Sequence, residues 1–159
     1  MEPTQINLEL FVKRITLDAN LPKLASKINA AQWDDENELD EADFTAETLE
    51  WYLSDDDNFF FACFAGSDIA GIVSAQFLRR AYGKIRTLYV DEIDTAVNFR
   101  RQGVATALMA EIKKLADDTD SYDLWLGTEK TNAGAQALYA SLQPDEVEEF
   151  VGYTWNLDD

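Results

Sequence analysis

The chain has no histidine and only one cysteine, and both shortages narrow the chemistry that it can perform. Without histidine, neither a Ser-His-Asp nor a Cys-His nucleophilic arrangement can form, and zinc sites of the usual kinds lack their ligands. Cys63 cannot form a disulfide within the chain, and its apolar surroundings, FFFACFAG, favour a small buried residue. We therefore expect no metal, and a general base that is a carboxylate, lysine, tyrosine or water.

Long apolar runs and positive charge are also scarce. No stretch approaches the ~18 apolar residues of a membrane span, and the N-terminus has no charged-then-apolar leader pattern, so we expect a cytoplasmic protein. There are 13 basic against 31 acidic residues, which gives a net charge of -18. This field would repel a nucleic acid or an anionic membrane, and we expect neither as a partner. A cationic partner fits better, although the same acidity can serve solubility alone.

The length of 159 residues predicts one domain over residues 1–159. Hydrophobic periodicity predicts a mixed α/β fold in which the last strands alternate with helices. Strands are expected at residues 6–16, 58–65, 68–78, 85–95, 122–127 and 149–157, and helices at 21–33, 45–53, 100–116 and 132–142. The most acidic stretch, Asp34–Asp43, has too few apolar residues to pack and is expected to be a loop.

Two adjacent arginines open the motif FRRQGVATAL, residues 99–108, at the joint between a predicted strand and the strongest predicted helix. A helix N-terminus leaves backbone N–H groups unpaired and attracts anions. Gly103 and Ala105 keep the approach open, while Arg100 and Arg101 add charge suited to a phosphate. The chain has neither G-x-x-x-x-G-K-[ST] nor G-x-G-x-x-G. The alternative is an ordinary surface helix with two solvated arginines.

At this motif the sequence resembles the GNAT N-acetyltransferases. Their pyrophosphate loop, [RQ]-x-x-G-x-[GA], matches Arg100–Ala105, and their N-x-x-A-x-x-L-Y pattern matches NAGAQALY at residues 132–139. The strand LYVDEIDTA before the loop looks like the family's central strand. The resemblance implies a mostly antiparallel sheet that is flanked by helices and splayed at this strand. It also implies direct acetyl transfer from acetyl-CoA, without an acyl-enzyme.

The resemblance assigns residues to the cofactor and to the leaving group. Those implied to bind acetyl-CoA are Ile93, Thr95, Arg100, Arg101, Gln102, Gly103, Val104, Ala105 and Asn132. Tyr139 would stand near the sulfur and protonate the departing thiolate. The alternative for Tyr139 is a core aromatic on the apolar side of its helix.

A carboxylate is needed because a free alkylamine is almost wholly protonated at pH 7 and cannot attack in that form. Glu92 falls where similar aminoglycoside enzymes have an acidic residue, so we predict it as the base, directly or through water. Asp91 and Asp94 are the reserves, and a solvated strand carboxylate is the alternative for each. Strict alternation would place Leu88, Val90, Glu92 and Asp94 on one face of the strand.

Within the family, the likeness to the aminoglycoside 3-N-acetyltransferases is the strongest that we see, through RRQG-x-A-T-A-L and A-x-x-L-Y. The chain departs from the family at Gln143 and Pro144, where a glycine is usual. We predict a small cationic amine as substrate, first an aminoglycoside 3-amino group. The acidic residues expected to attract it are Asp34, Asp35, Asp56, Asp91 and Asp94. A polyamine, a protein or peptide amine, and a non-catalytic acyl-CoA-binding module remain alternatives, and a homodimer is left open.

Overall fold

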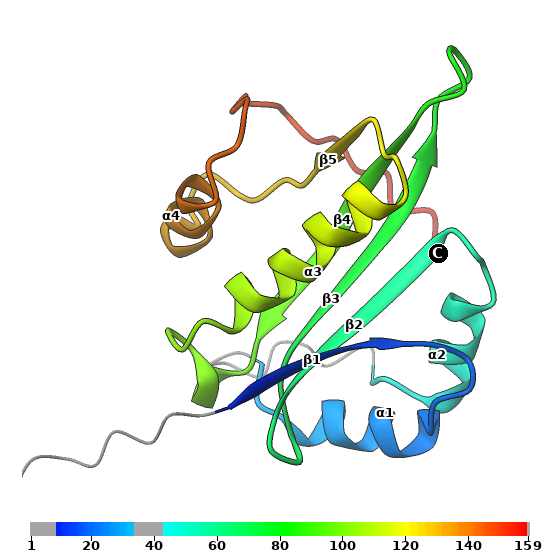
Figure 1. The fold of residues 1–159 in the computed structure, drawn as a ribbon, viewed down its shortest axis with the longest axis vertical. Coiled ribbons are helices and arrows are strands. Elements are labelled where there is room, and N and C mark those ends of the chain that lie inside the picture. Colours follow the sequence, from blue (N-terminus) through cyan, green and yellow to red (C-terminus); the bar gives the residue numbers. More distant parts are fainter. Residues whose placement is uncertain (1–8, 34–42, 159) are drawn as a thin grey trace, which may run out of the picture. The chain divides into compact units, whose positions relative to one another are not determined.

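The two apolar runs on either side of Gly66 form an antiparallel hairpin at the centre of a five-stranded sheet (Figure 1). The computed structural model describes residues 9–33 and 43–158. The strands lie in the order β1-β2-β3-β4-β5; the first three pairings are antiparallel and the last is parallel. Their bounds are β1 Leu10–Ile15, β2 Asn58–Ala65, β3 Asp68–Arg79, β4 Arg86–Thr95 and β5 Asp123–Trp125.

The chain divides into two compact units, with the boundary between Gly127 and Thr128. The first unit holds the whole sheet and the helices α1 (Leu21–Ala30), α2 (Ala46–Leu53) and α3 (Val104–Asp118). The second holds α4 (Ala133–Ser141) and the residues that follow it. A single domain over residues 1–159 therefore stays a prediction.

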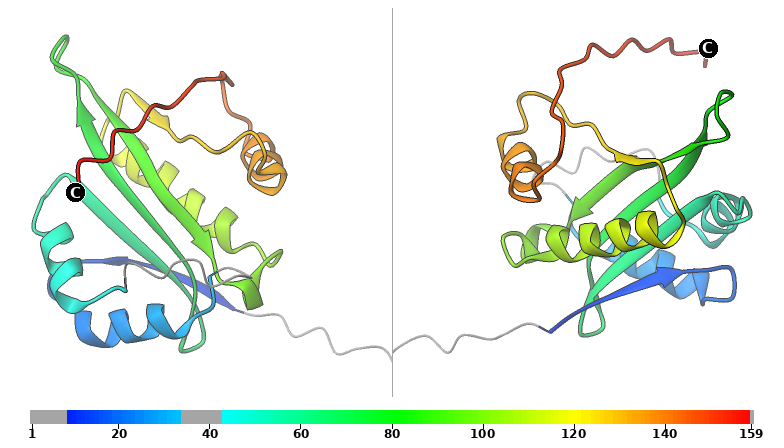
Figure 2. Two further views of the ribbon diagram at one scale, coloured as in Figure 1. Left: turned by 180° about the vertical axis from the view of Figure 1, so that it is seen from behind. Right: turned by 45° about the horizontal axis from the view of Figure 1, so that its top comes forward.

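Helices cover both faces of the sheet in the first unit. Leu24 and Ile28 of α1 and Leu49 of α2 pack in one buried cluster with Phe60 of β2. Helix α3 packs on the opposite face. A Cβ on Gly71 of β3 would point at Val104 and Leu108 of α3, whereas its neighbour Ile72 points to the α1–α2 face, since side chains alternate along a strand. Figure 2 shows α3 and the α1–α2 pair on opposite sides of the strands.

The start of α2 has a capping box formed by two threonines. Thr45 accepts from the backbone N–H of Thr48 at 3.0 Å, and the Thr48 hydroxyl accepts from the Thr45 N–H at 3.0 Å. The hydroxyl thus takes the part usually played by Glu or Gln in a capping box. This fixes where α2 begins beside the sheet.

Gly71 allows α3 to approach the sheet. A Cβ at this position would lie 2.5 Å from Cγ1 of Val104 and 2.9 Å from the carbonyl oxygen of Asp94. Only a residue without a side chain fits there. The N-terminus of α3 is therefore held against the end of β4.

Two of the predicted elements are corrected. The strand expected at 149–157 is absent: residues 149–158 have no regular secondary structure, and none of the described strands pairs with them. The alternating side chains there, such as Val151, Tyr153 and Trp155, are exposed, because a strand needs a partner and not only a pattern. The helix expected from residue 100 begins at Val104, after a short 3-10 turn at Val97–Phe99.

The other predicted elements are present, with shifts of one to three residues at several ends; residues 6–8, where the first strand was expected to begin, lie outside the described residues. The predicted loop over residues 34–43 lies almost wholly outside the described residues. None of the helices in the described part of the chain is long and apolar enough to cross a membrane.

Candidate functional site

A β-bulge interrupts β4 in the middle of its acidic run. Ser74 of β3 lies opposite Glu92, and the next residue, Ala75, lies opposite Val90. Asp91 is therefore the extra residue of β4, with no partner of its own on β3. A bulge bends its strand and redirects the side chains that follow it.

The bulge overturns the prediction that Val90 and Glu92 share a face. Ser74 and Ala75 are neighbours on β3 and point to opposite faces, and their partners Glu92 and Val90 do the same. Val90 is buried with 3% exposure on the α3 side, whereas Glu92 is exposed on the α1–α2 side. Asp94, opposite Ile72, follows Glu92 to that face. Two carboxylates thus stand together on the α1–α2 face of β4.

The electrostatics of this pair favour protonation. Partial loss of water raises the pKa of Glu92 above its usual value, and the negative charges of Asp94 and Asp91 raise it further. The pKa of Asp94 is also raised by loss of water, and the Arg100 guanidinium opposes part of that change. A carboxylate with a raised pKa holds a proton more tightly, so Glu92 is a stronger base than an ordinary glutamate.

Tyr52, which the sequence did not single out, lies beside the bulge. Its hydroxyl is 3.0 Å from the carbonyl oxygen of Phe59 and 3.0 Å from that of Ala75. Burial raises the pKa of Tyr52 to about 12, and the nearby charge of Asp91 adds to this. The helical spacing of Leu49, Tyr52 and Leu53 shows a tyrosine on the core side of α2, and this was the available signal.

The loop before α3 has the backbone shape of an anion site. Arg101 has φ 61° and Gly103 has φ 84°, both left-handed, so the helix cannot start before Val104. None of the described side chains caps the first turn, and the first helical bond runs from the Ala107 N–H to the Gly103 carbonyl at 2.9 Å. The N–H groups of Val104 and its two successors can therefore bind an anion.

Arg100 contacts residues outside this loop, whereas Gln102 contacts a residue within it. Arg100 donates to the carbonyl oxygen of Trp33 at 3.3 Å and also acts on Asp94, so it links the loop to the residues after α1. The Val97 N–H donates to the carbonyl oxygen of Gln32 at 2.8 Å and adds to this link. Arg101 and Gln102 are exposed, and the Gln102 side chain donates to the Asn98 carbonyl at 3.2 Å.

β4 is paired on its β5 side over only part of its length. The three residues of β5 pair with Thr87 to Tyr89, and none of the other described residues pairs with the rest of β4 on that side. Ile93 and Thr95 still pair with β3 on the other side, opposite Val73 and Gly71. The backbone edge of β4 is thus open on the β5 side, next to the start of α3.

In the second unit, Asn132 and Tyr139 lie on or beside α4. The Asn132 side chain caps the helix by accepting from the Ala135 N–H at 3.0 Å. Tyr139 is half-buried, two turns further along the same helix. The structure thus gives Asn132 a role as a helix cap, and its predicted contact with the cofactor stays a prediction.

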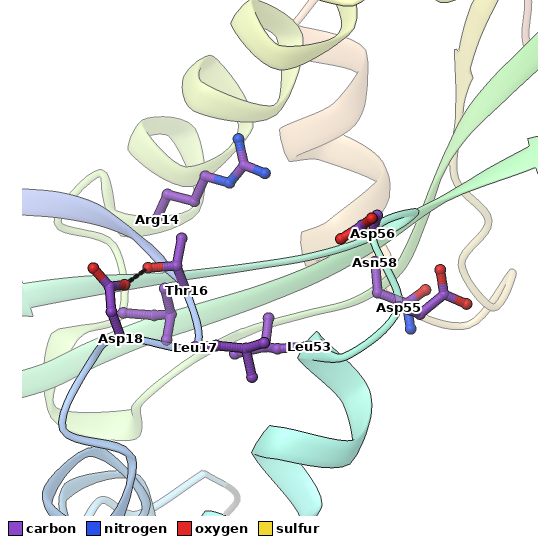
Figure 3. A pocket seen from close by; sticks show the side chains of 9 residues that line it. Arg14, Thr16, Leu17, Asp18, Leu53, Asp55, Asp56 and Asn58 are labelled. Atoms are coloured by element: carbon purple, nitrogen blue, oxygen red, sulfur yellow. Dashed lines mark hydrogen bonds between the residues drawn. The ribbon is translucent and has the colours of Figure 1, made fainter.

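A cleft of about 370 Å³ lies at the far edge of the sheet, where β1 ends and β2 begins (Figure 3). Asp18, Asp55 and Asp56 line it together with Arg14. The Thr16 hydroxyl donates to Asp18 and lowers the pKa of that carboxyl.

The structure does not bring Asp56 together with the acidic pair of β4. Ile15 of β1 lines this cleft, and it is aligned across the sheet with Phe60 of β2, Ser74 of β3 and Glu92 of β4. The backbones of Ile15 and Glu92 are therefore separated by three strand spacings of ~4.8 Å, or about 14 Å. Asp34 and Asp35 lie outside the described residues. Within residues 9–33 and 43–158, no three acidic or cysteine side chains converge as metal ligands would.

Comparisons with known proteins agree with this geometry. The family described as "Acetyltransferase (GNAT) family" matches residues 25–143. No curated protein matches the chain by sequence. Among solved structures, an aminoglycoside acetyltransferase from an uncultured soil metagenomic sample, in complex with sisomicin, has a TM-score of 0.79 and 19% identity. That match covers 94% of this chain and 97% of the other.

Two further structures are similar over nearly the whole chain. AAC(6')-Iy, in complex with a bisubstrate analogue of CoA and acetylneamine, has a TM-score of 0.72 and 16% identity, over 93% of this chain and 99% of the other. A ribosomal-protein-alanine N-acetyltransferase from Brucella melitensis biovar Abortus 2308 has a TM-score of 0.64 and 16% identity, over 91% and 100%. At these identities the likeness shows a shared fold.

Proposed function

Because the chain belongs to the acetyltransferase (GNAT) family and is an acetyl-CoA-dependent N-acetyltransferase, we propose that it acetylates a small cationic amine, first an aminoglycoside 3-amino group. The observation that carries this proposal is the pair Glu92 and Asp94 on the α1–α2 face of the bulged strand. An ammonium group is attracted to two neighbouring carboxylates, and it must lose a proton before it can attack.

Glu92 is the base in this proposal. Glu92, directly or through water, takes one proton from the ammonium and passes it to solvent. The neutral nitrogen then attacks the thioester carbonyl, forms the new C–N bond and loses its second proton to solvent. The C–S bond breaks, and the departing thiolate takes a proton from the Tyr139 hydroxyl, which regains one from solvent. The raised pKa of Glu92 suits the first transfer, since the proton then moves to a stronger base. Asp91 and Asp94 would attract the ammonium.

The cofactor side of the proposal rests on the loop before α3. Left-handed residues at 101 and 103 and an uncapped helix start present backbone N–H groups to a pyrophosphate. Arg101 and Gln102 add side chains at the same exposed loop, and Val104 and Ala105 supply first-turn amides. The open edge of β4 at Ile93 and Thr95 would pair with the pantetheine arm, and Asn132 would contribute from the second unit. Acetyl-CoA supplies the activated acetyl group.

The choice of substrate is supported by charge and by the fold. An aminoglycoside carries several ammonium groups, which suits a protein of net charge -18. Two of the similar structures are aminoglycoside acetyltransferases, and a third is named for acetylating a ribosomal-protein alanine. A peptide amine is therefore the second candidate, and a polyamine the third.

The test measures thiol release from acetyl-CoA with a panel of aminoglycosides, polyamines and peptide amines, at low and moderate salt. We expect turnover with at least one aminoglycoside, and a KM that rises with salt because the attraction is electrostatic. Turnover with peptides alone would replace the substrate class. If no amine reacts but CoA still raises the melting temperature, the chain is a non-catalytic acyl-CoA-binding module.

A further inference from the structure

The Tyr52 hydroxyl is hydrogen-bonded to the sheet at the bulge. It donates toward the carbonyl oxygens of Phe59 and Ala75, each 3.0 Å away, and is also hydrogen-bonded to the Ser74 side chain. Ser74 and Ala75 are the two residues of β3 between which the register changes. A single hydroxyl from α2 thus holds both β3 residues that face the bulge.

The ring and backbone of Tyr52 are fixed as well. The ring packs edge-on against Phe60, with centroids 6.4 Å apart, and the Asn58 side-chain amide donates to the Tyr52 carbonyl at 2.9 Å. Because the phenol is held at both ends, it adds a rigid link between α2 and β3. The hydroxyl shares its one proton between two carbonyl oxygens. If the hydroxyl were removed, both carbonyl oxygens would lose this donor and water would have to replace it.

Ser74 extends this link to the proposed base. It stands directly opposite Glu92, and side chains in such a cross-strand pair have Cβ atoms about 5 Å apart. The chain of contacts therefore runs from the Tyr52 hydroxyl to the Ser74 hydroxyl, and from there across to Glu92. Among the described residues, the charged groups that act on Glu92 are Asp94 and Asp91 from its own strand; Asp91 also acts on Tyr52 of α2, and Arg100 acts on Asp94.

We propose that Tyr52 is a positioning residue, whose hydroxyl fixes β3 opposite the bulge and thereby sets the place and the hydration of the Glu92 carboxylate. The proposal rests on the role proposed for Glu92 above. Tyr52 itself takes no proton from the substrate, because its hydroxyl already donates to backbone carbonyls inside the fold. Without this hydroxyl, water would enter beside Ala75 and solvate Glu92 more fully.

The closing experiment titrates Glu92 in the full-length protein by 13C NMR of glutamate side-chain carboxyls, with Glu92→Gln to assign the signal. In Tyr52→Phe, the Glu92 pKa should fall toward its ordinary value by roughly half a pH unit or more, because water stabilises the charged form. Ser74→Ala should move it in the same direction. Thr119→Val is the matched control, since it removes a part-buried hydroxyl bond to Leu115 at the far end of α3.

The kinetic arm uses an amine that the wild type acetylates. Tyr52→Phe should lower kcat about 10-fold, leave the KM for acetyl-CoA nearly unchanged and move the acid limb of kcat/KM to lower pH. An unchanged Glu92 pKa in Tyr52→Phe, or an equal fall in Thr119→Val, would overturn the inference. If Tyr52→Phe fails to fold, Ser74→Ala decides by the same criterion. If the wild type acetylates nothing, the proposed function fails, and the titration still decides the role of Tyr52.

Discussion

Val90 and Glu92 stand two positions apart in β4 and point to opposite faces of the sheet, because Asp91 is an extra residue between them. The inward turn of Val90 keeps the α3 side of the sheet apolar, while Glu92 reaches the opposite side beside Asp94. An unbulged strand would have directed Glu92 into the core below α3. The bulge therefore makes a carboxylate available on a strand whose other half is buried.

Replacing Glu92 by glutamine should remove the base and keep the shape of the site. We expect kcat to fall about 10²- to 10⁴-fold, the usual contribution of a positioned general base, with CoA binding retained. Thiol release and calorimetry with CoA measure the two effects. Glu50→Gln, at an exposed position of α2, is the matched control and should leave both unchanged. A Glu92→Gln enzyme with wild-type kcat would transfer the role to Asp91 or Asp94.

The same variant should not be less stable at neutral pH. The pKa of Glu92 is raised in the folded protein, so the folded state binds the proton more tightly than the unfolded chain. Ionisation above the unfolded pKa therefore opposes folding, and a neutral glutamine removes this effect. The melting temperature of Glu92→Gln should be equal to or above that of the wild type at pH 7, and the difference should shrink as pH falls. A lower value at pH 7 would mean that loss of structure explains the loss of activity.

Asp94→Asn should shift the acid limb of kcat/KM to lower pH. The negative charge of Asp94 raises the Glu92 pKa, and without that charge Glu92 loses its proton at lower pH. The measurement is kcat/KM against pH with one amine that the wild type acetylates. Asp117→Asn, at the exposed end of α3, supplies the control. A shift to higher pH would show that Asp94 does not act on Glu92 through its charge.

Most of the fold follows from hydrophobic periodicity, and the family follows from two short motifs. The hairpin around Gly66 and the helices α1 to α4 were predicted at nearly their observed places. The bulge at Asp91 was not, because alternation is a local rule and a bulge is set by how β3 pairs. The residues 149–157 show the converse: a strand pattern that finds no partner among the described strands.

Only part of the candidate site could be predicted from the sequence, because contacts between distant residues leave no local pattern. The glycine and the arginines of the loop are recognisable by type and spacing, and their backbone shape agrees with an anion site. Tyr52 carries no motif, since its importance comes from the carbonyls of β2 and β3 that its hydroxyl reaches. Such contacts join residues far apart in the chain, and a single sequence does not reveal them.

Gly71→Ala should weaken both the fold and the cofactor site. Its Cβ would lie 2.5 Å from Cγ1 of Val104 and 2.9 Å from the Asp94 carbonyl, so α3 must move away from β3. Overpacking of this kind costs about 1–3 kcal/mol of unfolding free energy. Urea unfolding and CoA calorimetry measure the two effects. Gly152→Ala, with nothing within 4 Å, is the control and should behave as wild type. Unchanged CoA affinity in Gly71→Ala would show that cofactor binding does not depend on the position of α3.

Gly103→Ala should lower CoA affinity through backbone conformation alone. No atom of residues 9–33 or 43–158 lies within 4 Å of the added Cβ, but the φ of 84° is unfavourable for alanine by about 1 kcal/mol. The loop should relax, and its amides should no longer converge on the pyrophosphate. Gly66→Ala is a close control: φ is 63°, none of the described atoms lies within 4 Å of its Cβ either, and the residue belongs to the turn between β2 and β3. Equal loss of CoA affinity in both variants would contradict a local role for Gly103.

Tyr139→Phe tests the proposed acid, which lies in the second unit. If the phenol protonates the thiolate, its loss should lower kcat about 10²-fold or more, because proton transfer to the leaving group then depends on water. The defect should shrink as pH falls, since hydronium can supply the proton. CoA binding should persist, because the ring remains. Tyr153→Phe, exposed in the same unit, is the control. A kcat equal to wild type across the whole pH range would leave Tyr139 as a packing residue of α4 and assign the proton to water.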